Sequence, residues 1–204
     1  MIKTALYIKL KDYNFEKLFK QKGYSYFTNG AYNLNIIGVR SAGAKVTNTF
    51  DDYLVLIYKT PTGNWMRQIY SITTDPGRYY MLNPIQKKGT AILVPGQYKG
   101  AYKIGLHRGK YKALCQNRPL TIYRDYNKND VYDYDPTTLE DGYFGINIHK
   151  AGTNSTRVDT WSAGCQVFMS NEDFKHFMNY CEKQVSSGMG STFTYTLLKE
   201  EDLV

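Results

Sequence analysis

The stretch YLVLIYKT (53–60), PTGN (61–64), WMRQIYSITT (65–74) contains two apolar and aromatic runs around a short polar segment. Val, Ile, Tyr and Thr favour extended backbone, and a Pro-Thr-Gly-Asn segment is a strong turn signal. The stretch therefore predicts a β-hairpin. The composition of the whole chain also favours β-strands, because it contains 20 tyrosines in addition to its Thr, Ile and Val.

Outward from this hairpin the sequence predicts mainly strands and only one or two helices. One helix follows Asn14 and ends at Gly23, and a second begins at Ser170 with a capping-box-like start. The second helix has a predicted buried face that comprises Phe174, Phe177, Met178, Cys181 and Val185. Further strands are predicted at 2–10, 32–39, 90–94, twice within 98–117, at 120–126, 143–149 and 191–203.

The length and net charge of the chain indicate a single basic domain. The 204 residues are enough for a single domain with a core, in which we expect 1–50 to form a strand-helix-strand extension and 51–204 the core unit. The formal charge of +8 favours an anionic partner such as nucleic acid, acidic membrane or bacterial wall polymer. No apolar run approaches the roughly 20 residues of a membrane span. The first residues read as a strand rather than a signal peptide.

The three cysteines differ in their surroundings. Cys181 lies on the apolar stripe of the late helix and Cys115 lies within a strand, so both are predicted to be packed. Cys165 instead ends the small-residue turn SAGC (162–165), and His149 ends an apolar strand shortly before it. Such a pair is the minimal set for thiol catalysis, in which the histidine accepts the proton and lowers the pKa of the thiol. An odd cysteine count without a CxxC spacing argues against a disulfide framework.

The surrounding motifs resemble the active-site signature of the L,D-transpeptidase (YkuD-like) family. The matching residues are Ile148-His149, Gly152-Thr153-Asn154 and Ser162-Ala163-Gly164-Cys165. The hairpin over 53–73 and the segment 94–104 resemble the family more distantly, so the likeness extends loosely over 51–168. It implies a β-sandwich or barrel, no cofactor, and a cysteine acyl-enzyme that remodels bacterial peptidoglycan as a transpeptidase, carboxypeptidase or endopeptidase.

The resemblance also assigns roles to individual residues. Cys165 would be the nucleophile and His149 the base, oriented by the backbone carbonyl of Lys150. Ser162 would shape the turn, and the amides of Gly164 and Cys165 would form an oxyanion hole.

Several positions depart from the family pattern. Ala163 stands where the family usually has His, and Gln166-Val167 stands where an aliphatic residue and then Arg or Asn are usual. Two residues also separate His149 from Gly152. Because the Arg that follows the cysteine is missing, recognition of a substrate carboxylate would pass to Arg157 or Arg108.

The sequence also contains two sets of candidate metal ligands. Zinc could use His149 and Cys165 with His107 or Asp159, although no HxxxH, HExxH or CxxC spacing supports it. Asp125-x-Asn127-x-Asn129 suggests a calcium loop, but Asp130 replaces the glycine of the sixth position and Pro136 the glutamate of the twelfth. A solvated acidic loop over 127–142 is the other interpretation.

Two non-enzymatic interpretations remain open. One is a phage structural or wall-binding module on the same fold, and the other is a nucleic-acid binder that uses the Tyr/Lys-rich segment 98–117. We expect peptidoglycan and not nucleic acid as the partner. Because no signal peptide is seen, delivery to the wall is expected through phage lysis, a virion or secretion machinery, or else the sequence lacks a leader that was removed.

Overall fold

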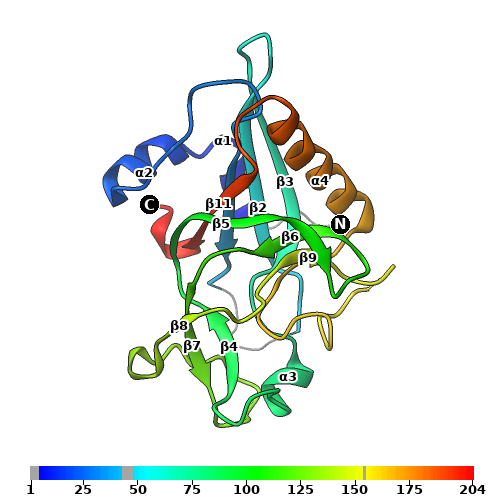
Figure 1. Ribbon diagram of the computed structural model, residues 1–204. Helices are drawn as coiled ribbons and strands as arrows, with labels where there is room; N and C mark the ends of the chain where they lie inside the picture. The colour runs from blue at the N-terminus through cyan, green and yellow to red at the C-terminus, as the bar shows by residue number, and fades with distance from the viewer. Residues whose placement is uncertain (1–4, 43–47, 154) are drawn as a thin grey trace.

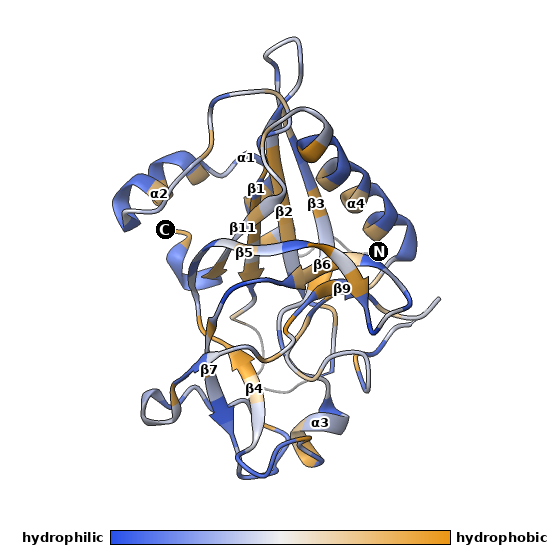
Figure 2. Ribbon diagram, viewed as in Figure 1, coloured by the Kyte–Doolittle hydropathy of each residue, from blue (hydrophilic) through white to orange (hydrophobic). Residues whose placement is uncertain are grey.

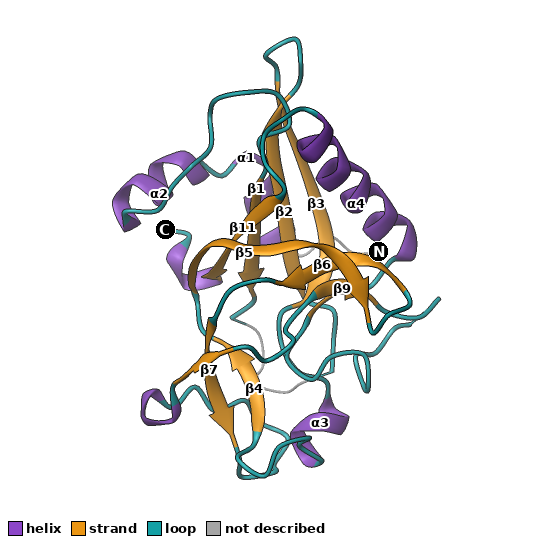
Figure 3. Ribbon diagram, viewed as in Figure 1, coloured by secondary structure: helices purple, strands orange, loops and turns teal. Residues whose placement is uncertain are grey.

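A computed structural model describes residues 5–42, 48–153 and 155–204, and within these ranges eight strands close into a barrel (Figures 1 and 3). The barrel order is β1-β11-β5-β6-β9-β10-β3-β2, and a second sheet has the order β4-β7-β8. The barrel strands are β1 (Asn35–Arg40), β2 (Asp52–Lys59), β3 (Trp65–Thr73), β5 (Gly96–His107), β6 (Tyr111–Gln116), β9 (Ile148–Lys150), β10 (Gln166–Phe168) and β11 (Thr192–Lys199). The smaller sheet contains β4 (Thr90–Leu93), β7 (Leu120–Asp125) and β8 (Glu140–Gly142).

Four α-helices accompany the strands in the described residues, more than the one or two predicted. They are α1 (Ala5–Asp12), α2 (Phe15–Lys22), α3 (Arg78–Leu82) and α4 (Asn171–Ser186), and the 3₁₀ turns are η1 (Pro136–Thr138) and η2 (Glu200–Asp202). The fold is therefore mainly β, as predicted. No helix in the described part of the chain is long and apolar enough to cross a membrane.

The predicted hairpin is confirmed as β2 and β3. The two strands pair antiparallel from Asp52↔Ile72 to Lys59↔Trp65. Their turn is closed by Gly63, whose N–H donates to Thr60 O at 2.9 Å and whose φ of 83° suits glycine. The local turn chemistry thus sets the register of the barrel's longest antiparallel pair.

Strand β2 is buried on both faces because it separates two hydrophobic cores. Leu54, Leu56 and Tyr58 face the core inside the barrel, whereas the residues between them, such as Val55 and Ile57, face a second core. Helices α1 and α2 supply residues to that second core. In Figure 2 much of the visible surface of α2 is hydrophilic. The period of two along β2 therefore sorts its side chains between the cores.

The predicted strand over 2–10 is wrong for the described residues, where α1 begins at Ala5. Leu6 and Leu10 are its buried residues, and their spacing of four places both on one side of a helix. By contrast, α2 is confirmed with its predicted caps: Asn14 accepts from Lys17 N at 3.0 Å, and Gly23 has φ 68°.

The late helix α4 is also confirmed, with one error on its buried face. Ser170 caps it by accepting from Asp173 N at 3.1 Å, and Cys181 is fully buried in the barrel core as predicted. Val185, however, is 41% exposed, and Gln184 is buried in its place. The Gln184 side chain accepts from Leu34 N at 3.1 Å and donates to Thr192 O at 3.1 Å, so backbone partners from two other segments hold it inside.

The strand predicted over 143–149 is much shorter than expected, because only Ile148–Lys150 is extended and paired. The preceding backbone instead turns around the side chain of Gln116. Its Oε1 accepts N–H bonds from Phe144, Gly145 and Ile146 at 2.9, 2.9 and 3.2 Å. This loop leads directly into the candidate site.

Candidate active site

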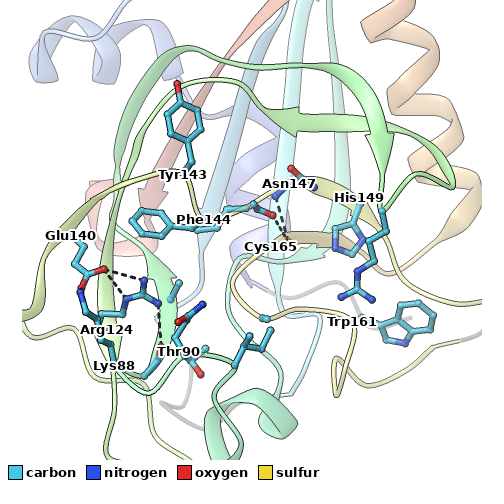
Figure 4. A pocket seen from close by; sticks show the side chains of 18 of the residues that line it. Lys88, Thr90, Arg124, Glu140, Tyr143, Phe144, Asn147, His149, Trp161 and Cys165 are labelled. Atoms are coloured by element: carbon cyan, nitrogen blue, oxygen red, sulfur yellow. Dashed lines mark hydrogen bonds and ion pairs between the residues drawn. The ribbon is translucent and has the colours of Figure 1, made fainter.

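A cavity of about 650 Å³ lies between the barrel and the small sheet. Strand β4 forms one wall, and the β5–β6 turn and the segments leading into β9 and β10 form others. Figure 4 shows His149 and Cys165 at this cavity with Trp161 near them. The structure thus brings the two residues of the predicted catalytic pair to one concave surface.

Strand register explains why both side chains point the same way. Strands β9 and β10 run parallel, with Ile148 beside Gln166 and His149 beside Val167. Because side chains alternate along a strand, Cys165 shares the cavity side with His149, while Ile148 faces the barrel core.

The turn before Cys165 is held by short hydrogen bonds. The buried Ser162 Oγ donates to Cys165 O at 2.8 Å and accepts from Gly164 N at 3.2 Å. Gly164 has φ 121°, and a Cβ at this position would clash with the carbonyl oxygen of Ala91. Only glycine fits here, which accounts for Gly164 in the SAGC turn.

Gln166 anchors the same turn from the barrel interior. Its Oε1 accepts from Tyr195 OH at 2.8 Å, and its Nε2 donates to Thr74 O and Gly164 O, both at 3.3 Å. This residue departs from the resembled pattern, and a fully buried amide network accounts for the polar side chain at this position.

The thiol of Cys165 is not bonded to His149 in the described structure. It accepts from Asn147 N at 3.4 Å and lies 3.5 Å from Gly145 O (Figure 4). Burial raises the pKa of Cys165 to about 11, against smaller lowering effects of Asn147 N–H and the charge of Arg108. The prediction that His149 lowers this pKa is therefore wrong for the free protein, because the imidazole is uncharged and does not contact the sulfur.

His149 is oriented as the resemblance implies. Its Nδ1 lies 2.9 Å from Lys150 O, and because a carbonyl only accepts, Nδ1 carries the proton and Nε2 is left as the basic nitrogen. Burial lowers the pKa of His149 to about 3, with a further lowering from the neighbouring His107. His149 is therefore a neutral imidazole with an unprotonated Nε2 over the physiological range.

His107 and Asn147 complete this wall, and the motif comparison missed both. The His107 ring stacks on His149 with centroids 4.0 Å apart. Asn147 Oδ1 accepts from Gln116 N at 2.9 Å, which turns its Nδ2 toward His107 Nδ1 at 3.1 Å. Asn147 could have been predicted to lie beside His149, because the two residues are two positions apart on a predicted strand and such residues lie on the same face. His107 comes from a distant strand and leaves no local signal.

Gly152 and Trp161 form the rim beside His149. A Cβ on Gly152 would clash with the Trp161 ring, so the glycine of the GTN motif lets the indole lie against the backbone. Trp161 is 41% exposed and lines the cavity, which leaves an apolar surface available to a ligand.

The two candidate recognition arginines lie in different places. Arg108 lines the cavity. Its charge contributes to the lowered pKa of His107 and His149 and offsets a part of the raised pKa of Cys165. It has no ion-pair partner among the described residues. Arg157 does not line this cavity, and its Nε is 3.9 Å from Asp159 Oδ1.

The end of the cavity near the small sheet is also basic. Lys88 Nζ and Arg124 Nη2 lie 2.9 and 3.0 Å from the carboxylate of Glu140. Together with Arg108 the walls carry three cations against one carboxylate. Within residues 5–42, 48–153 and 155–204, no three His, Cys, Asp or Glu side chains are grouped to hold a metal ion.

Alkylation of Cys165 should depend steeply on pH. Only the thiolate is nucleophilic, so below the raised pKa we expect the rate with iodoacetamide to rise about tenfold per pH unit between about pH 7 and 10. Peptide mass spectrometry would follow each cysteine, with the fully buried Cys181 remaining unlabelled. A rate that is already constant near pH 7 would show that a thiolate forms without substrate, contrary to this expectation.

Comparisons of the chain with protein-family models, with curated protein sequences and with solved structures give no match.

Proposed function

We propose that the protein is a cysteine-dependent acyl-transfer enzyme acting on peptidoglycan stem peptides. The observation that carries the proposal is that His149 and Cys165 line the same cavity. The Lys150 carbonyl accepts from Nδ1 of His149, which leaves Nε2 as the nitrogen that can accept a proton. The turn around Ser162 and Gly164 supports it, because its geometry requires the residues that the resemblance matches.

The proposed reaction is attack of the Cys165 sulfur on a substrate carbonyl carbon. His149 Nε2 takes the thiol proton as the C–S bond forms, and then gives it to the amine that leaves when the C–N bond breaks. Water or a second amine next attacks the thioester, transfers its proton to His149, and releases the thiol. Hydrolysis and transpeptidation thus share the same acyl-enzyme.

One amide is free to stabilise the oxyanion. The Cys165 N–H has no hydrogen-bond partner among the described residues, whereas the Gly164 N–H already donates to Ser162 Oγ. Of the two amides expected to form the oxyanion hole, we therefore retain Cys165 as the donor.

The substrate class is inferred from charge. Stem peptides carry carboxyl groups, and Arg108, Lys88 and Arg124 give the cavity an excess of positive charge. The net charge of +8 would also favour residence on an anionic wall. We therefore propose Arg108, rather than Arg157, as the residue that binds a substrate carboxylate.

His149→Gln should slow acylation of Cys165 by at least about a hundredfold, the usual scale for a positioned base. Intact-protein mass spectrometry with tetrapeptide-stem muropeptides from several wall types would measure the adduct and the loss of the terminal D-amino acid. His176→Gln is the matched control, because His176 lies on α4 and does not line the cavity. Its Nδ1 is 3.0 Å from the Tyr70 hydroxyl oxygen. Equal rates in both variants would remove His149 from the mechanism.

A non-catalytic wall-binding module is the second candidate. The raised pKa of Cys165 and the absence of a described bond between its thiol and His149 favour it. The same experiment separates the two functions. If no muropeptide mixture gives an adduct or a product while iodoacetamide still labels Cys165, the protein only binds.

A further inference from the structure

The loop that follows β7 carries oxygen-bearing side chains at alternate positions. Asp125 ends the strand, and Asn127, Asn129 and Asp133 follow at the third, fifth and ninth positions counted from it. The seventh position, Val131, supplies a backbone carbonyl. Ca²⁺ prefers oxygen ligands, and calcium loops draw them from the same five positions. The loop lies beyond the end of β7, away from the barrel (Figure 1).

Asp125 is a buried carboxylate that lacks a full set of partners. The residue is 1% exposed, and its Oδ2 accepts from Asp133 N at 2.9 Å, which places the carboxylate under the loop. Its Oδ1 is buried and has no hydrogen-bond partner among the described residues. The protein therefore compensates the charge of this carboxylate only in part. A bound cation would compensate this charge.

Hydrogen bonds link the other side chains within the loop. Asn127 Nδ2 donates a very short hydrogen bond to Asp133 Oδ2, so the amide NH2 group lies against the second carboxylate. Asn127 Oδ1 accepts from Asn129 N at 3.1 Å, and Asn129 Oδ1 accepts from Val131 N at 2.9 Å. Each of these carbonyl oxygens has a second lone pair that can bind a cation.

Lys128 is a cation within the loop, whereas other charged groups near the loop are engaged elsewhere. Arg124 Nε and Nη2 bind Glu140 at 3.1 and 3.0 Å, so this guanidinium does not neutralise the loop. Asp130 is 2.7 Å from Arg78, and Asp135 Oδ1 caps Thr137 N at 2.8 Å. Asp125 and Asp133 are the carboxylates at the five ligand positions, and Lys128 in the same loop offsets one of their two charges.

We propose that the 125–133 loop binds Ca²⁺ through the carboxylates of Asp125 and Asp133, the amide oxygens of Asn127 and Asn129, and the Val131 carbonyl. Water completes the six to eight oxygens that Ca²⁺ takes. Pro136 stands where a bidentate Glu would add two ligands. We therefore expect weak binding, with a Kd of roughly 0.1–1 mM, as in extracellular modules.

The ion would also support the candidate active site. Tyr132, inside the loop, donates from its hydroxyl to Pro76 O at 2.8 Å, and the adjacent Gly77 N donates to Ser162 O at 2.8 Å. Two hydrogen-bonded steps thus connect the loop to the turn that presents Cys165.

Terbium luminescence and thermal melting test the proposal independently of any activity at Cys165. Tyr126, Tyr132 and Tyr134 lie in or beside the loop and should sensitise bound Tb³⁺, which Ca²⁺ should displace. Ca²⁺ at about ten times its Kd should raise the Tm by roughly 3–6 °C, whereas equal Mg²⁺ should have a much smaller effect.

Two ligand variants and one control make the test specific. Asp133→Asn and Asn129→Ala should each weaken Ca²⁺ binding by at least about tenfold. Asp141→Asn makes the same change as Asp133→Asn at the exposed residue of β8 and should leave binding unchanged. Three results would overturn the proposal: no Ca²⁺-dependent Tm shift at about 10 mM, equal stabilisation by Mg²⁺, or unchanged binding in both ligand variants.

Discussion

Cys165→Ala is expected to abolish adduct formation and muropeptide turnover, with a loss of about 10⁴-fold or more. The substitution removes only the sulfur, which is the atom that must form the thioester. The fold should tolerate the change, because Ser162, Gly164 and Gln166 hold the turn and the thiol makes only long contacts of 3.4 and 3.5 Å. The Tm should therefore stay within about 3 °C of the parent value.

Cys115→Ala is the matched control, since it deletes the same atom from the other partly exposed thiol. Product release by chromatography, adduct mass and thermal melting would be measured on all three proteins. Retained turnover in Cys165→Ala would rule out this cysteine as the nucleophile. Loss of turnover in both variants would indicate a structural effect shared by the two thiols instead of the proposed chemistry.

Cys181→Asp should unfold the chain or destabilise it by about 4 kcal/mol or more. Cys181 is 0% exposed and lies in the barrel core with Phe177 and Phe193. A carboxylate at this site would be desolvated without an ion-pair partner, a penalty that is large beside the roughly 5–15 kcal/mol stability of an ordinary domain. Circular dichroism and urea denaturation would measure the loss.

Asn179→Asp separates burial from charge, because it adds the same group on the exposed side of the same helix. We expect this variant to melt close to the parent protein. If Cys181→Asp were as stable as Asn179→Asp, the packing of α4 against the barrel core would be wrong.

Local chemistry made part of the fold predictable from the sequence. The hairpin over 53–74, the caps at Asn14 and Ser170 and the burial of Cys181 all follow from residues close together in the chain. Turn residues, caps and hydrophobic period act over a few residues, so a single sequence contains the whole signal.

Part of the candidate site was predictable for the same reason. Cys165 and His149 end neighbouring segments of one short stretch, and the hydrogen bond between Lys150 O and His149 is local. Gly164 was identifiable because the small-residue turn consists of four consecutive residues. The structure explains the glycine, because a Cβ at this position would clash with Ala91 O.

The remaining features depend on contacts between distant residues. Leu6 and Leu10 are buried by the second core, and Gln184 displaces Val185 because Leu34 and Thr192 supply its partners. In the cavity, His107 reaches His149 only through the pairing of β5, β6 and β9.

Protonation was likewise decided by the tertiary structure. The Cys165–His149 pair alone predicts a thiolate, whereas burial raises the thiol pKa to about 11 and lowers that of His149 to about 3. Residue identity determined which groups can ionise. Solvent exclusion by the assembled barrel and small sheet determined that both are neutral at rest, because a desolvated site disfavours the charged form of each group.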